Sequence, residues 1–130
     1  MVNEFMDKAK ELLNTPDTTA ECDAADIEQN KVMALLSYLW LLFLVPLFLA
    51  KESKFARFHA NQGIVLAVAG TAIGIILGIA AFIPVVNIIV GIVGGLVELA
   101  VLALTVLGIY NAVQGKAKEL PLIGKYKILK

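Results

Sequence analysis

The sequence has few charged or reactive side chains over its second half, and these absences exclude several classes of function. Residues 63 to 114 contain one charged residue, Glu98. The chain has a single cysteine, Cys22, which cannot form an internal disulfide, and a single histidine, His59, which has no companion ligands for a metal. No Ser-His-Asp set, phosphate-binding glycine loop or pair of carboxylates can be assembled. We therefore predict a non-enzyme with no catalytic residue, no cofactor and no metal.

Hydrophobic residues, by contrast, are abundant. They make up 59% of the 130 residues, compared with about 45–50% in soluble domains, and the mean hydropathy is +0.83. The formal net charge is zero, and the charges gather in residues 1–31, 51–57 and 116–130. This segregation is typical of a membrane protein. We predict the lipid bilayer as the main partner, and no nucleic acid.

Three apolar runs are long enough to cross a bilayer, since about 20 residues at about 1.5 Å each span a hydrocarbon core of about 30 Å. The runs are Val32–Ala50, Ile64–Phe82 and Ile88–Tyr110. Pro46 is expected to bend the first, and the stretch Ile83–Asn87, with Pro84, separates the others. The sequence predicts an all-α integral membrane protein with three transmembrane helices. Its parts are 1–31 (amphipathic helix and acidic linker), 32–115 (three-span membrane domain) and 116–130 (basic tail).

The N-terminal segment predicts a short amphipathic helix over Asn3–Asn14. Its apolar side chains recur at spacings of three and four, and Thr15-Pro16 ends the pattern. We expect this helix to pack on the rest of the protein or on the lipid surface, or else to dock on a partner.

The distribution of lysine and arginine predicts the orientation, because cytoplasmic segments carry an excess of both residues. With three spans, the loop 51–62 and the tail 116–130 lie on one side, and together they hold eight of these residues, from Lys51 to Lys130. The N-terminal segment is acidic. We therefore predict a multi-pass protein with its N-terminus outside and its C-terminus cytoplasmic.

The stretch FARFHANQG, Phe55 to Gly63, places many hydrogen-bonding groups between two apolar runs. Phe55, Arg57 and Phe58, together with the preceding Lys51 and Lys54, are suited to anchoring in the membrane interface, and the preceding Ser53 is a suitable N-cap. The polar side chains exceed what anchoring requires. We therefore predict a cytoplasmic polar cluster that ties this stretch to the segment around Asn111 and Gln114. Its members are Arg57, His59, Asn61 and Gln62.

Glycines recur every four residues on two of the predicted spans, which indicates close helix packing in lipid. The packing glycines are Gly70, Gly74, Gly78, Gly91 and Gly95. The face that they form is either a seam within the chain or an interface between copies.

Glu98 lies near the middle of the last span, where a charge costs about 2.5–3.5 kcal/mol on insertion scales. Something should offset that cost. We expect either a protonated carboxyl bonded to Thr71 or to a backbone carbonyl, or a proton or cation site.

Three segments also resemble a known family. They are DIEQNKVMALLSYL (Asp26–Leu39), PLFLAKESKFARFHANQG (Pro46–Gly63) and GIYNAVQGKAKELPLIGKYKIL (Gly108–Leu129). They resemble small bacterial membrane proteins grouped as a domain of unknown function, which is itself similar to the Tic family of chloroplast import components. The resemblance covers about the last hundred residues. It implies an integral protein of the bacterial cytoplasmic membrane and a candidate role in protein import.

Three hypotheses of function follow. The first is a non-enzymatic membrane protein that acts by association, in a structural or assembly role, as a homo-oligomer or with other membrane proteins. The second is an oligomeric proton-coupled transporter or channel that uses Glu98. The third, which depends on the resemblance, is a protein-import component.

Overall fold

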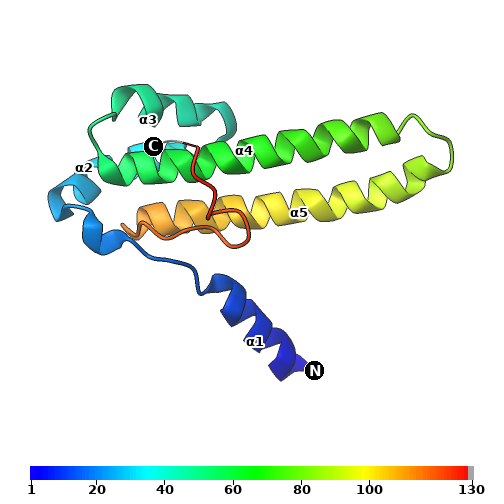
Figure 1. Ribbon diagram of the computed structural model, residues 1–130, viewed down its shortest axis with the longest axis horizontal. Helices are drawn as coiled ribbons and strands as arrows, with labels where there is room; N and C mark the ends of the chain where they lie inside the picture. The colour runs from blue at the N-terminus through cyan, green and yellow to red at the C-terminus, as the bar shows by residue number, and fades with distance from the viewer. Residues whose placement is uncertain (129–130) are drawn as a thin grey trace.

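Figure 1 shows the computed structural model, which describes residues 1–128; in that range the regular secondary structure is helical, and one isolated β-bridge is also present. The α-helices are α1 (Val2–Leu13), α2 (Ala24–Leu36), α3 (Leu44–Leu49), α4 (Lys54–Ala80) and α5 (Val86–Val113). Short 3-10 turns lie at Thr19–Glu21 (η1) and Trp40–Phe43 (η2).

Helices α4 and α5 form a long antiparallel hairpin (Figure 1). Ser53 caps α4, since its hydroxyl accepts a hydrogen bond from the Ala56 amide at 3.0 Å, which confirms the predicted N-cap. The predicted interruption around Pro84 is confirmed as the hairpin turn, where Val85 adopts a positive φ of 72°. Both helices are long and apolar enough to cross a membrane, at a mean hydropathy of 2.4 each.

The predicted first span, Val32–Ala50, is not a single helix, and a third span is not found among residues 1–128. Helix α2 ends at Leu36, and the chain turns back through η2 into α3, which lies beside the first half of α4 (Figure 1). Pro46 does not bend a long helix. It lies in the first turn of α3, where backbone N–H groups have no hydrogen-bond partner within the helix, so the lack of an N–H in proline costs nothing there.

The hydrophobic core lies at one end of the hairpin, where α2 packs on both α4 and α5. Phe55 from α4, Ala112 from α5 and Tyr38, which follows α2, are buried there. The segment after α5 completes this core with Ala117 and Leu120. We call this part of the molecule the polar end, because it also holds the buried polar side chains.

The N-terminal linker and the C-terminal segment lie against each other at the polar end. The Thr18 amide donates to the Ala117 carbonyl at 2.9 Å, and the Glu119 amide donates to the Pro16 carbonyl at 3.0 Å. Asp17 and Lys118 form the isolated β-bridge. Segments that hydrogen-bond to each other cannot lie on opposite faces of a membrane, so the prediction of an outside N-terminus with a cytoplasmic C-terminus is wrong.

Candidate functional site

The centre of the polar end is the buried ring of His59. Its Nε2 lies 2.7 Å from the Lys116 carbonyl oxygen, and its Nδ1 lies within hydrogen-bond distance of the Tyr38 hydroxyl. A carbonyl only accepts, so Nε2 carries the hydrogen and Nδ1 of the neutral ring accepts from Tyr38. Phe55 and Phe58 meet the imidazole edge-on, with centroids 4.9 and 5.3 Å away. One side chain thereby links α4, the turn after α2 and the segment after α5.

Asn61 and Gln62 hold the C-terminal tail through its backbone. Gln62 donates from Nε2 to the Gly124 carbonyl at 3.0 Å and accepts from the Leu120 amide at 2.8 Å. Asn61 donates to the Tyr126 carbonyl at 3.0 Å and accepts from the Ile128 amide at 2.6 Å. Both side chains are buried. The side-chain amides of Asn61 and Gln62 therefore satisfy backbone groups of the tail that would otherwise lack hydrogen-bond partners within the fold.

The other members of the predicted cluster lie nearby. Arg57 is half-buried one turn before Asn61 and lines a surface cavity of about 470 Å³ together with Glu119 and Lys127. Glu119 and Lys127 form an ion pair at 3.0 Å. Asn111 is buried and donates to the Lys118 carbonyl at 3.4 Å. The structure thus brings the predicted polar residues to one place, around the tail.

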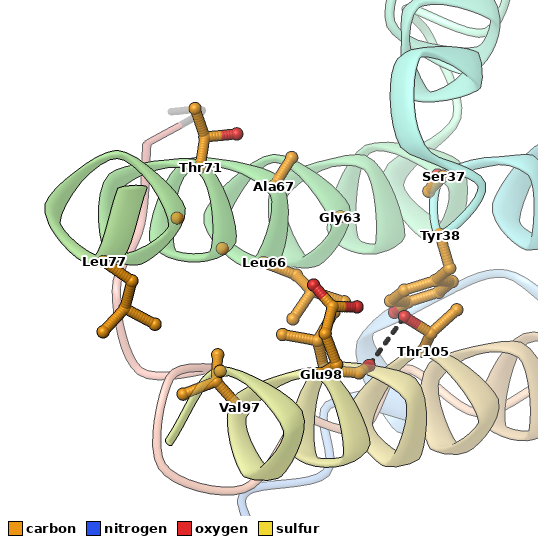
Figure 2. Close-up of a pocket in the computed structure, with 14 residues that line it drawn as sticks. Ser37, Tyr38, Gly63, Leu66, Ala67, Thr71, Leu77, Val97, Glu98 and Thr105 are labelled. Carbon is orange, nitrogen blue, oxygen red and sulfur yellow. Dashed lines mark hydrogen bonds between the residues drawn. The ribbon is translucent and has the colours of Figure 1, made fainter. Parts of the chain in front are cut away.

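A second cavity, of about 540 Å³, lies between α4 and α5 next to the polar end. The carboxyl of Glu98 extends from α5 into the space between the helices, with Tyr38 and Thr105 beside it (Figure 2). The Thr105 hydroxyl donates to the Val101 carbonyl at 2.8 Å. Thr71 borders the cavity, but its side chain points away from Glu98 in Figure 2, and the predicted hydrogen bond between them is not formed among the described residues.

The predicted packing glycines border open space within the single chain. A Cβ added at any of four of them would meet no atom within 4 Å, and at the fifth, Gly70, the nearest atom is a Val101 methyl at 3.9 Å. The four are Gly74, Gly78, Gly91 and Gly95. These positions form no tight seam between α4 and α5, so the seam within the chain is not the reason for their spacing.

Close contacts involve other glycines, which the sequence analysis did not single out. A Cβ at Gly63 would lie 1.8 Å from the Ser37 carbonyl oxygen, and one at Gly108 would lie 2.2 Å from the Tyr38 ring. The signal for these contacts was the pair Ser37-Tyr38, two polar residues inside an apolar run. A hydroxyl in such a run must be paired. The Tyr38 hydroxyl bonds His59 on α4, and the Ser37 hydroxyl donates to the Met33 carbonyl at 3.4 Å.

Among residues 1–128, no group of three or more His, Cys, Asp or Glu side chains lies close enough to hold a metal ion. The arrangement instead supports two physical tasks. The polar end fixes a tail and a linker onto a helical hairpin, and the Glu98 cavity leaves room beside an acidic group.

Comparison with known sequences places the chain in a family. The sequence profile described as the magnetosome magnetite crystal formation protein family, of MamF and MmsF, matches residues 29–127. The chain belongs to this family.

Relatives in the family cover most of the chain. Magnetosome protein MmsF of Paramagnetospirillum magneticum is 36% identical over 95 residues, which are 73% of this chain and 82% of MmsF. Magnetosome protein MamF of the same organism is 30% identical over 118 residues, 91% of this chain and 95% of MamF. A UPF0132 membrane protein of Methanocaldococcus jannaschii is 42% identical over 76 residues, 58% of this chain and 63% of that protein. No solved structure matches the chain significantly.

These relatives confirm the predicted resemblance in its coarser form, to a family of small membrane proteins, and the chain is a membrane protein. The further similarity to the Tic family is not shown by them. The import role, which depended on that similarity alone, therefore has no support here.

Proposed function

We propose that this protein acts by association in the membrane, as a non-enzymatic structural or assembly component in magnetite crystal formation. The family description and the two magnetosome relatives support the setting. The observation that carries the mode of action is the open space beside Gly74, Gly78, Gly91 and Gly95. In lipid, backbone approach over small residues is a main source of helix packing energy. This face has room for a helix of another copy or of another membrane protein.

In this proposal α4 and α5 cross the bilayer and both termini lie on the cytoplasmic side. The lysines and arginine near the ends of the hairpin support this orientation, because the turn over residues 81–85 carries no charge. These residues are Lys51, Lys54, Arg57, Lys116, Lys118, Lys125 and Lys127. The linker and the tail, which bond to each other, then share one compartment.

The segment from α2 to α3 enters the membrane from that side and returns without crossing. Leu41, Leu42 and Phe48 are exposed in the single chain, as expected for side chains that face lipid. The backbone turn at Ser37–Leu39 is covered by α4, since Ser37 and Tyr38 are buried. Non-helical backbone is tolerated at membrane depth where protein covers it.

A matched pair of substitutions on α5 tests the association. Gly95→Leu fills the open face, whereas Ala103→Leu adds a similar bulk at an exposed position about 80° away around the helix. Each variant is purified in mild detergent and its oligomeric state is measured by light scattering with cross-linking. Gly95→Leu should weaken association and Ala103→Leu should not. Equal association of both variants would contradict the proposal.

The setting is tested in Paramagnetospirillum magneticum cells from which MmsF has been removed. Expression of this chain is expected to shift the size distribution of the magnetite crystals, measured by electron microscopy, toward that of the parent cells. The Gly95→Leu variant should do so less than Ala103→Leu. If the protein is well expressed and the crystal sizes do not change, the proposed role in magnetite crystal formation is contradicted.

A second candidate, the proton-coupled transporter or channel, is favoured by one observation, the Glu98 carboxyl at the cavity between α4 and α5. Glu98→Gln separates the two candidates, because it keeps the size and polarity of the side chain but removes its titratable proton. An assembly protein should retain oligomeric state and crystal phenotype. Loss of pH-driven flux in proteoliposomes with unchanged assembly would favour transport.

A further inference from the structure

Helix α1 contributes no buried residue to the fold. It extends away from the other helices in Figure 1, and Phe5 and Val2 are 71% and 72% exposed. The helix lies outside the residues 29–127 that match the family profile. Among residues 1–128, no part of the chain buries the apolar side chains of this helix.

The faces of α1 are sharply divided. At about 100° per residue, the apolar side chains fall within an arc of about 120°. They are Val2, Phe5, Met6, Ala9, Leu12 and Leu13. Lys8 and Lys10 lie at the two borders of this arc, and the acidic side chains lie at the centre of the opposite face. Those acids are Glu4, Asp7 and Glu11.

This division fits a flat boundary between hydrocarbon and water better than the groove of a protein. Lysine stems at the two borders can lie along apolar surface while their ammonium groups reach the headgroups. The acids at the centre then point to water. A protein groove imposes no such symmetric placement of the two lysines.

The C-terminal end of α1 is held near the fold by the residues that follow it. The Thr15 hydroxyl donates to the Glu119 carbonyl at 2.6 Å, and the Pro16 carbonyl accepts from the Glu119 amide. This tie belongs to the polar end, where α5 ends at Val113 and the hairpin leaves the membrane in the proposed orientation. A helix of 12 residues is about 18 Å long, too short to cross a hydrocarbon core of about 30 Å.

We propose that α1 lies flat in the headgroup layer on the side of the polar end, with its apolar arc toward the acyl chains. The proposal rests on the membrane-crossing position of α4 and α5. The side chains of α1 carry three acids against two lysines, so attraction to anionic lipid contributes little and apolar burial holds the helix. Its contact with lipid should therefore persist at high salt and with zwitterionic lipid.

The test uses the full chain in phosphatidylcholine vesicles, in a Cys22→Ser background with one introduced cysteine carrying an environment-sensitive fluorophore. Labels at Phe5→Cys and Leu12→Cys should be quenched by lipid-borne nitroxides and be several-fold less quenched by aqueous iodide than labels at Glu4→Cys and Glu11→Cys. High salt should leave the difference unchanged. Since α1 buries nothing in the fold, these variants should fold normally.

A label at Ile76→Cys, on the exposed part of α4, reports separately whether the hairpin lies in lipid. Lipid quenching at Ile76 with equal iodide quenching at all four α1 positions would overturn the surface helix but not the proposed position of the hairpin. Protection at Phe5 that disappears when labelled protein is diluted with vesicle lipid would indicate contact with a second copy, and would also overturn it.

Discussion

The half of the α4–α5 hairpin near Lys54 and Val113 differs from the half near the turn in what its glycines and polar groups contact. At the polar end, Gly63 faces the Ser37 carbonyl and Gly108 faces the Tyr38 ring, with no space for another atom. Near the turn, Gly74 and Gly95 face open space. In the half at the polar end, other parts of the chain cover the glycines. In the half near the turn, the face with small residues is uncovered.

The polar groups follow the same division. His59, Asn61 and Gln62 are buried and each has a partner within the chain. Glu98, in contrast, is exposed within the single chain and borders a cavity. An ionisable group in lipid is costly unless protein or water meets it, so the proposed membrane position of the hairpin requires a partner or water at Glu98. The comparison therefore separates residues that hold the fold from residues available for association.

The sharpest test of this division compares Gly63→Ala with Gly74→Ala. At Gly63 the new Cβ would overlap the Ser37 carbonyl oxygen, and backbone cannot move aside as easily as a flexible side chain. Overpacking of this kind costs about 1–3 kcal/mol, and we expect the upper end or loss of folding. Gly74→Ala should change stability by less than about 1 kcal/mol.

Thermal unfolding in mild detergent, followed by fluorescence-detected size-exclusion chromatography, measures both variants. Equal midpoints for Gly63→Ala and Gly74→Ala would erase the distinction between the filled half and the open half.

A smaller effect on the stability of the hairpin is expected from the double change Asn61→Ala plus Gln62→Ala. It leaves four tail backbone groups without their partners, on Leu120, Gly124, Tyr126 and Ile128. Each such group that stays buried costs about 1–3 kcal/mol, so the tail should detach before the hairpin unfolds. Trypsin should cleave faster after Lys125 and Lys127.

The control for this change is Lys51→Ala plus Lys54→Ala, which removes two exposed lysines at the same end of α4. It should leave tail cleavage and folded yield nearly unchanged. Greater damage from the lysine pair would mean that anchoring by charge, and not the amide bonds, organises this end.

The hairpin could be predicted from sequence because its causes are local. Two apolar runs of sufficient length are separated at Pro84, and the structure confirms the turn there. The need for polar partners was also predictable, since buried histidine and amide side chains require them. The partners themselves were not: the sequence indicated the segment around Asn111 and Gln114, whereas the bonds go to the Lys116 carbonyl and to backbone groups between Leu120 and Ile128.

The break in Val32–Ala50 was not accessible in the same way. A crossing helix and a pair of short helices that turn back can have the same length and hydropathy. Which of the two forms here depends on contacts with residues distant in sequence, those of Tyr38 with His59 and of Ser37 with Gly63. The error in orientation followed directly. With three crossings the two ends of the chain lie on opposite sides of the membrane, whereas in the proposed arrangement of two crossings they lie on the same side.

The glycine pattern shows the limit of periodicity. A spacing of four residues identifies a shared helix face, as it did for Gly91 and Gly95, but not what that face meets. Gly63 and Gly108 belong to no such repeat, and only the fold brings each against the turn after α2.

The smallest predicted effect concerns the linker at the polar end and depends on pH. Asp17 accepts hydrogen bonds from the Thr19 hydroxyl and from the Thr19 amide, the latter at 2.9 Å. The pKa of this carboxyl is held below its ordinary value of 3.8. The main cause is the hydrogen bond from the Thr19 side chain, followed by the bond from the Thr19 backbone and, more weakly, by the charges of Lys118 and Lys116. The pKa is therefore lower in the folded than in the unfolded protein. A group of this kind contributes stability above its unfolded pKa, and that contribution is lost as the pH falls through the folded pKa.

Hydrogen exchange at the Thr18 and Glu119 amides, which bond the linker to the tail, measures this contribution. In the unsubstituted protein, protection at these amides should hold above pH 3.8 and decline below it. Asp17→Asn removes the charge. In this variant, protection of the two amides should be slightly lower than in the unsubstituted protein above pH 3.8, and nearly independent of pH below it. The difference should stay under about 1 kcal/mol, because the carboxylate is exposed and solvent screens it. A larger acid-induced loss in Asp17→Asn than in the unsubstituted protein would show that another group governs the linker.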